Sequence, residues 1–317
     1  MVADVSTVPE AKPTLLKRTP ESGAPTQADI QYHWMMAWFI GGLLLGDIVL
    51  AQIAHFRRLD TLLDCLPTAC LLGGIACYCD RRNFGRCKEI SVLAMWVVLA
   101  TNALSLLVQV AGRVPSPFVD SSLAGLDRLM GASTGEVVAW VLHYPLLQQL
   151  LWASYQSIPV LVLASLLLPT TFGYYKESRC YVFAVTITGI IISAIFACWP
   201  ALGPWTIYHF PPTKSQQVYI SYLNLLRSTQ PITLDLGASG IVTFPSFHTA
   251  LAVHSAVALW NVKYVRYFAA LLSAAVCAST ITTGWHYFSD VLGGATLALV
   301  SIAIARWSMN RPMNAAN

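Results

Sequence analysis

The chain has 317 residues, of which 56% are hydrophobic and only 11% are charged, and its net charge is +4. Because soluble domains carry roughly a quarter charged residues, this composition excludes an ordinary soluble domain. The basic residues are scattered and form no basic face with interleaved aromatic side chains, so we expect no nucleic acid among the partners.

The first 30 residues are polar, rich in proline, threonine and alanine, and free of any apolar stretch. Such a composition is typical of a disordered segment, and it lacks the apolar centre of a secretory signal. We therefore expect residues 1–30 to form a disordered cytoplasmic tail.

Apolar segments follow, several of them near the length of about twenty residues that crosses the hydrocarbon of a bilayer. Runs such as residues 187–197 do not alternate between apolar and polar side chains, which excludes a transmembrane barrel. The sequence therefore predicts an all-α polytopic membrane protein with about eight transmembrane helices, at residues 34–54, 62–79, 90–111, 148–168, 180–200, 248–262, 264–283 and 286–306.

Two connections between these segments differ from the others. Residues 119–144 are amphipathic and are interrupted by Gly131 and Gly135, so we expect interfacial helices that lie against the bilayer. Residues 201–247 form the longest polar connection, and a loop of this length is usually functional or disordered.

Basic residues near the ends of the segments indicate the cytoplasmic side, because cytoplasmic loops carry an excess of lysine and arginine. If the amino terminus is cytoplasmic, most basic residues fall on that side: Lys12, Lys17, Arg18, Arg81, Arg82, Arg86, Lys88, Lys176, Arg179, Lys263, Arg266, Arg306 and Arg311. Eight crossings with both termini inside fit this bias best, and Arg57 and Arg58 cut against it. The residues left outside are Arg57, Arg58, Arg113, Arg128, Lys214 and Arg227. Residues 201–247 would then face the periplasm, the outside or a lumen, in a bacterial inner membrane or a plasma membrane.

Two polar segments at the starts of predicted helices interrupt the apolar background. Residues 244–249 read Phe-Pro-Ser-Phe-His-Thr, and residues 284–290 read Gly-Trp-His-Tyr-Phe-Ser-Asp. Two crossings separate them, so both should lie on the same, non-cytoplasmic side. Helix N-termini offer free N–H groups and the positive end of the helix dipole, which stabilise a phosphate group.

Two histidines and an aspartate in these segments could carry chemistry. His286 and Asp290 are four residues apart and should share one helix face. The carboxylate can then hold one imidazole nitrogen protonated and leave the other free to attack or to coordinate. His248 could face this pair across a phosphorus atom, whereas we interpret His143 and His254 as satisfied polar groups.

These segments resemble the signature of the type 2 phosphatidic acid phosphatase superfamily, which contains lipid phosphatases, lipid phosphotransferases and vanadium haloperoxidases. Its Pro-Ser-Gly-His motif matches residues 245–248, with Phe247 in place of glycine. Its Ser-Arg…His…Asp motif matches at Ser279, His286 and Asp290, with Thr280 in place of arginine. The first motif of the family has no counterpart with the correct spacing. The segment around His248 resembles the branch that contains inositol phosphorylceramide synthases, which belong to sphingolipid metabolism, and their bacterial relatives.

The resemblance implies catalysis through a phosphohistidine, with no cofactor and no metal. His286 would be the nucleophile, Asp290 would orient it, and His248 would protonate the leaving oxygen. The phosphate oxygens would be bound by residues of the two segments and of the long connection: Ser246, Phe247, Thr249, Ser279, Lys214 and Arg227.

The resemblance also implies a six-helix catalytic membrane domain at residues 90–310, to which residues 31–89 add two N-terminal helices. The expected function is that of an integral-membrane lipid phosphatase or phosphotransferase, with a phosphorylated lipid and the bilayer as partners. The missing arginine removes a bidentate phosphate clamp. Either other cations bind the phosphate, or the substrate is a diester with less charge, which favours head-group transfer over monoester hydrolysis.

Three alternatives stay open. A metal-dependent membrane hydrolase could use His248, His286 and Asp290 as ligands, although helix N-termini suit an anion better than a cation. A non-enzymatic transporter could use the polar pocket for its substrate, although no internal repeat is visible. An inactive family member would fit the lost arginine. The eight cysteines lie mostly in apolar runs and predict no structural zinc site.

Overall fold

The computed structural model describes residues 27–54, 56–58, 64–228, 230, 232–233 and 241–310. The expected cytoplasmic tail lies outside these residues as far as position 26, and a helix already begins at Gln27. The described residues form helices, apart from turns, loops and two short strands that pair in parallel.

Each apolar segment that the sequence predicts contains a helix within the described residues, and further helices lie in the connections between them. In chain order the elements are α1 (Gln27–Ile53), β1 (Phe56–Arg58), α2 (Leu66–Arg81), α3 (Gly85–Gly112), α4 (Asp120–Leu129), α5 (Thr134–Leu142), α6 (Pro145–Gln156), α7 (Ile158–Thr171), α8 (Tyr175–Cys198), α9 (Trp205–Tyr208), α10 (Lys214–Arg227), β2 (Ile232–Thr233), α11 (Phe247–Leu259), α12 (Arg266–Thr282) and α13 (Phe288–Asn310).

Four of the described helices, α1, α3, α8 and α13, are long and apolar enough to cross a membrane. A fifth span is possible if α6 and α7, which are bent by 45° at the break between them, cross together. The chain is therefore a multi-pass membrane protein. The remaining apolar helices, α2, α11 and α12, have 16, 13 and 17 residues. At a rise of about 1.5 Å per residue they are shorter than about 30 Å of hydrocarbon, so eight crossings stay a prediction.

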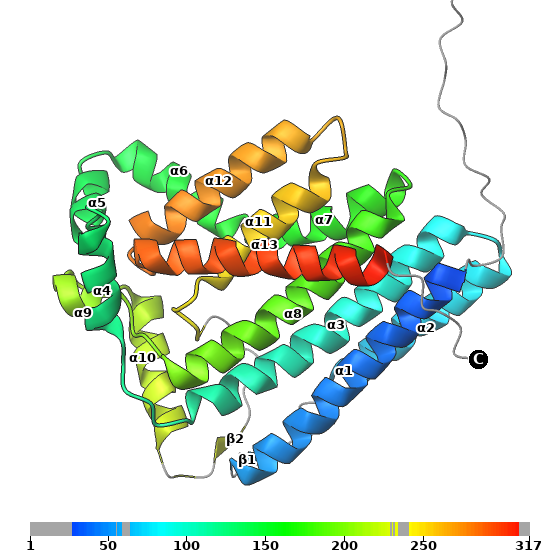
Figure 1. The fold of residues 1–317 in the computed structure, drawn as a ribbon, viewed down its shortest axis with the longest axis horizontal. Helices are drawn as coiled ribbons and strands as arrows, with labels where there is room; N and C mark the ends of the chain where they lie inside the picture. Colours follow the sequence, from blue (N-terminus) through cyan, green and yellow to red (C-terminus); the bar gives the residue numbers. More distant parts are fainter. Residues whose placement is uncertain are drawn as a thin grey trace, which may run out of the picture.

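Helix α8 lies in the middle of the bundle. It packs against α3 on one side and against α7, α11 and α13 on the other, while α1 and α2 lie along the outer edge next to α3 (Figure 1). Gly189 of α8 permits the close approach of α3, because an added Cβ would lie 2.5 Å from the side chain of Leu104. The apolar core at this contact includes Leu93, Tyr181 and Phe183.

A buried polar group joins the first helix to this bundle. Glu89 of α3 accepts two hydrogen bonds from Arg179 of α8, at 2.7 and 3.0 Å. His33 of α1 lies 3.7 Å from the same carboxylate and accepts a hydrogen bond from the indole N–H of Trp96 at 3.2 Å. Arg179 also lies over the ring of Tyr32. These contacts fix α1 against α3 and α8 near their starts.

Short helices gather at the other end of the bundle, where α13 begins (Figure 1). The amphipathic stretch that we expected at the interface contains α4 and α5, and the long connection contains α9 and α10. Arg113, just after α3, donates hydrogen bonds to the carbonyls of Ser228 and Gln230 and lies over the ring of Phe56. This end of the molecule holds both polar segments that the sequence singled out.

Candidate active site

The start of α11 is built around Ser246. Its hydroxyl oxygen caps the helix by accepting hydrogen bonds from the N–H and the hydroxyl of Thr249, at 3.3 and 3.1 Å. Its own N–H donates to the carbonyl of Asp290 at 3.1 Å. This contact requires glycine at position 294, because a Cβ on Gly294 would lie 2.2 Å from the carbonyl oxygen of Ser246. The beginnings of α11 and α13 are thereby brought together.

His286 and Asp290 form a buried pair beside this cap. The Nδ1 atom of His286 lies 3.3 Å from Oδ2 of Asp290, and the N–H of Tyr287 donates to the same oxygen at 2.9 Å. The side chains are 3% and 0% exposed. One detail of the prediction is corrected: α13 begins at Phe288, so His286 precedes the helix instead of lying on its face. The pairing survives because Asp290 folds back over the turn.

Burial makes His286 a neutral base at physiological pH. Its pKa falls from 6.5 to about 4, because removal from water disfavours the charged imidazolium. With Nδ1 directed at Asp290, the lone pair on Nε2 is the one that can attack an electrophile. Both properties suit a nucleophile.

His248, on the first turn of α11, faces His286 with 6.3 Å between the ring centroids and 53° between the ring planes. Its other neighbour is Tyr155 of α6, which is stacked on it at 4.5 Å and 17°. The two imidazoles are close enough to contact one bound phosphoryl group. Tyr155 covers one face of the His248 ring.

The N-terminus of α13 is not available to an anion, contrary to our expectation. The N–H groups of Phe288 and Ser289 donate to the two oxygens of Asp127, each at 2.9 Å. A carboxylate from α4 therefore occupies the positive end of this helix, a tertiary contact that the local sequence does not encode. The N–H groups of Phe247 and His248, in the first turn of α11, donate to no described residue. Of these two helix starts, that of α11 keeps N–H donors for a phosphate among the described residues.

Ser279 and Thr280, in the last turns of α12, are buried next to the His286 turn, and the carbonyl of Thr280 accepts the N–H of His286 at 3.2 Å. Both hydroxyls donate to carbonyls of their own helix, Ser279 to Val276 and Thr280 to Cys277, at 2.7 Å. A phosphate role for Ser279 stays a prediction, and it requires rotation of this hydroxyl.

The two cations of the long connection lie at opposite ends of α10. The first turn of this helix reaches the His286 turn, where Gln216 donates to the carbonyl of Gly284 at 3.2 Å, and Lys214 is exposed on the same turn. Arg227 is eleven residues beyond Gln216, about 16 Å along a helix axis. It donates to the carbonyl of Ser116 and lies 4.0 Å from the ring centroid of Phe118. The structure does not bring Arg227 to the histidines.

Sequence reasoning missed three residues at this site: Tyr155, Asp120 and Asp127. Tyr155 gives no signal, because an aromatic residue in an apolar stretch usually belongs to a core. The two aspartates do give one. They lie seven residues apart on one face of an amphipathic helix, and a buried carboxylate near hydrocarbon is costly unless it has a partner.

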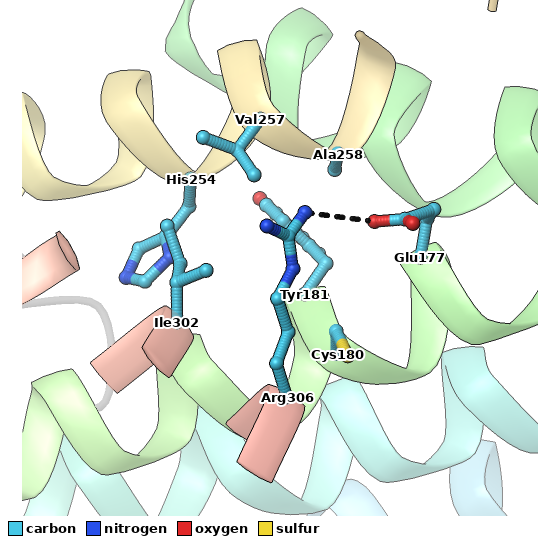
Figure 2. A pocket seen from close by; sticks show the side chains of 8 residues that line it. All are labelled: Glu177, Cys180, Tyr181, His254, Val257, Ala258, Ile302 and Arg306. Carbon is cyan, nitrogen blue, oxygen red and sulfur yellow. Dashed lines mark hydrogen bonds and ion pairs between the residues drawn. The ribbon is translucent and has the colours of Figure 1, made fainter. Parts of the chain in front are cut away.

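A second polar group lies deeper in the bundle. His254 of α11 shares hydrogen bonds with Thr188 of α8 at 3.0 Å, and Thr188 contacts Ser301 of α13 at 2.7 Å. A cavity of about 10 Å³ lies beside His254 and is bordered by the ion pair of Glu177 and Arg306 (Figure 2). That volume is about the size of one water molecule, so the cavity is too small for a lipid phosphate.

The fold and the facing histidines define a multi-pass membrane protein with a polar site at one end of its helical bundle. The family model of the PAP2 superfamily matches residues 121–304, which is more than half of the chain. The chain therefore belongs to the PAP2 superfamily. The match runs from α4 into α13 and includes both histidines. No curated protein and no solved structure matches the chain.

Proposed function

We propose that this protein transfers or hydrolyses the phosphoryl-linked head group of a membrane lipid through a phosphohistidine on His286. Membership of the PAP2 superfamily supports phosphatase-type activity on phosphoric esters in general. The observation that carries the more specific proposal is the pair of facing histidines, one of them paired with a buried aspartate.

In the first step, Nε2 of His286 attacks phosphorus in line with the leaving oxygen, and the N–P bond forms as the P–O bond breaks. His248, in its protonated form, gives its proton to the leaving oxygen. Asp290 stabilises the positive charge that develops on His286 by accepting a hydrogen bond from its Nδ1–H group. In the second step, neutral His248 takes a proton from water or from an alcohol. The resulting oxygen nucleophile attacks phosphorus and restores free His286.

The first turn of α11 is the proposed binding site for the phosphate oxygens. The N–H groups of Phe247 and His248 have no acceptor among the described residues, and the helix dipole favours an anion there. Ser246 and Thr249 lie in the same turn, and Ser279 lies across from it on α12. Lys214 is the cation of the long connection whose helix turn reaches the His286 loop.

The charges around the site favour a phosphodiester over a dianionic monoester. No arginine or lysine among the described residues forms an ion pair with the site residues, and Thr280 stands where the family has arginine. Asp120, Asp127 and Asp290 surround the His286 turn. A singly charged diester needs less positive charge than a monoester. This supports head-group transfer between lipids, as in the branch of inositol phosphorylceramide synthases.

We also propose that residues 90–310 form the catalytic membrane domain, with residues 31–89 as additional helices. The site would then face the non-cytoplasmic side of a bacterial inner membrane or a plasma membrane. The family match within residues 121–304 and the basic residues near one set of helix ends support this arrangement.

The test is a turnover assay of the purified full chain on lipid monoesters and diesters, with free phosphate and transferred head group measured separately. We expect transfer or hydrolysis of diesters that survives strong chelation, is inhibited by vanadate and is lost in His286→Ala. Activity that chelation abolishes and zinc restores would contradict the proposal and favour the metal-dependent hydrolase. Among the described residues, the histidine, cysteine and acidic side chains form no group of three that could hold a metal ion.

A further inference from the structure

Asp127 of α4 is a fully buried carboxylate that caps a different helix. Its Oδ2 atom accepts the N–H of Phe288 and its Oδ1 atom accepts the N–H of Ser289, both at 2.9 Å. Thr134, at the start of α5, donates its hydroxyl to Oδ2 at 3.3 Å. The carboxylate therefore has three donors and lies at the positive end of α13, where a negative charge is stabilised.

Asp120 repeats this arrangement two helical turns earlier on the same face of α4. Its oxygens accept the N–H groups of Leu202 and Gly203 at 2.9 and 2.7 Å, and Oδ1 also accepts the hydroxyl of Tyr287 at 3.1 Å. Its side chain is buried, and its hydrogen-bond partners among the described residues are backbone N–H groups and the hydroxyl of Tyr287. Asp120 thus ties the side chain of Tyr287 to the start of the long connection.

Together these contacts hold every residue from position 286 to position 290. His286 and the N–H of Tyr287 bind Asp290, the hydroxyl of Tyr287 binds Asp120, and the next two N–H groups bind Asp127. The two carboxylates of α4 contact no atom of His286 itself, so they act on it only through the turn.

We propose that Asp127 and Asp120 are positioning residues that hold the imidazole of His286 in its reactive orientation. This inference rests on the proposed function. In-line attack needs the nucleophile within a narrow range of positions, and a displacement of about 1 Å lowers the rate by about 100-fold. Loss of a carboxylate that accepts two backbone N–H groups frees the start of α13, and with it the residue that orients His286.

The first experiment measures, without substrate, how firmly the turn keeps the imidazole of His286 buried. The full chain, in detergent, is treated with diethyl pyrocarbonate, and the modification rate of each histidine is followed by mass spectrometry. His254 is the internal reference, because it is equally buried, at 2% exposure, and its hydrogen bond is with Thr188 of α8. We expect Asp127→Asn to raise the rate at His286 by about tenfold through local opening and to leave the rate at His254 unchanged.

The matched control is Glu136→Gln, which removes an exposed carboxylate in the first turn of the neighbouring helix α5. In this variant, His286 should be modified at the wild-type rate. Tyr287→Phe serves as a second variant that keeps the ring and removes only the hydroxyl bond to Asp120. It should raise the rate at His286 by a smaller factor, and it decides the question if Asp127→Asn does not fold.

The second experiment uses turnover. Asp127→Asn should lower kcat by about 10- to 100-fold while KM stays within about twofold, because the phosphate site on α11 is untouched. An unchanged rate at His286, or an equal rise at His254, would overturn the inference, since the carboxylates would then serve only general folding. A wild-type chain that turns over no phosphorylated lipid would refute the proposed function, yet the labelling result would still decide whether α4 positions His286.

Discussion

At the scale of single residues, the two histidines of the site should differ in what their loss does. His286→Ala removes the nucleophile, so turnover should fall by several orders of magnitude on any substrate. His248→Ala removes the general acid, which contributes about 10²- to 10⁴-fold, and its loss should matter least when the leaving group is a weak base. Asp290→Asn should be intermediate. The measurement is kcat of each variant on a lipid phosphate and on an activated aryl phosphate.

If the activated substrate rescues His286→Ala but not His248→Ala, the two roles are reversed. If neither substitution changes turnover, the chemistry takes place elsewhere. Each imidazole is held by its own neighbour: His286 by Asp290 and His248 by Tyr155. Removing one histidine should therefore leave the other in place.

Tyr155 should contribute through its ring. A stacked aromatic pair is worth about 0.5–1.5 kcal/mol beyond its buried area, which corresponds to about 2- to 12-fold in kcat/KM if the stack orients His248. Tyr155→Leu should show this loss, and Tyr155→Phe should not. Trp152→Leu is the control, since Trp152 lies on the same helix and is 58% exposed. Equal losses in Tyr155→Phe and Tyr155→Leu would mean that the hydroxyl, and not the stack, matters.

The buried state of His286 predicts the acidic side of the pH profile. Its pKa is about 4 in the folded protein against 6.5 for an exposed histidine, so the free base persists as the pH falls through 6 and 5. The acidic limb of kcat/KM should therefore lie well below pH 6. The free energy of unfolding depends on pH in the same direction, because the unfolded chain binds a proton at this histidine at a higher pH than the folded chain does. The stabilisation by neutral His286 is complete above pH 6.5 and is lost as the pH falls toward 4.

The check is a pH series of kcat/KM, paired with denaturation midpoints at each pH. An acidic limb centred near 6.5 would show that His286 titrates as an exposed imidazole, and it would contradict its assignment as the buried nucleophile.

At the scale of elements, the contact between α11 and α13 should be intolerant of any side chain. A Cβ at position 294 would lie 2.2 Å from the backbone carbonyl of Ser246, which cannot move without displacing the cap of α11. Gly294→Ala should lower stability by about 1–3 kcal/mol and abolish most turnover. Gly42→Ala in α1, where no atom lies within 4 Å of the added Cβ, is the control. A Gly294→Ala variant with the wild-type melting temperature and kcat would refute this packing.

The sequence predicted where helices form, but it did not predict the bend between α6 and α7 or the residue that caps α13. Apolar length alone placed helices at every segment that the sequence marked, because burial in lipid demands them. The break between α6 and α7 at Ser157 was not foreseen, since a run of apolar residues carries no record of a bend. The caps of α11 and α13 differ in the same way: Ser246 is local and readable, whereas Asp127 comes from 161 residues away.

At the scale of the whole molecule, the pairing of the two polar segments was predictable and the origin of their support was not. The sequence predicted that His248, His286 and Asp290 would lie on the same side, because two apolar segments separate the two motifs, and in the structure the three side chains lie close together. The sequence also offered Arg227 as a phosphate ligand, but it lies at the end of α10 opposite to the turn that reaches the His286 loop. The spacing of residues in the sequence predicts which side chains meet within one helix. It does not predict where a long connection places its side chains.

Helices α11 and α12 can sit in the bilayer in two ways. With 13 and 17 residues they are short for a crossing of the bilayer. Either each helix crosses a locally thinner part of the bilayer, or the pair enters and leaves the bilayer on one side. The basic residues Lys263 and Arg266 between them favour a crossing, because the positive-inside bias draws that turn to the cytoplasm. Impermeant thiol labelling of Lys263→Cys and Lys214→Cys, in a chain without its native cysteines, should then report opposite sides. Labelling of both from the same side would mean that the two helices form a re-entrant hairpin, and eight crossings would be wrong.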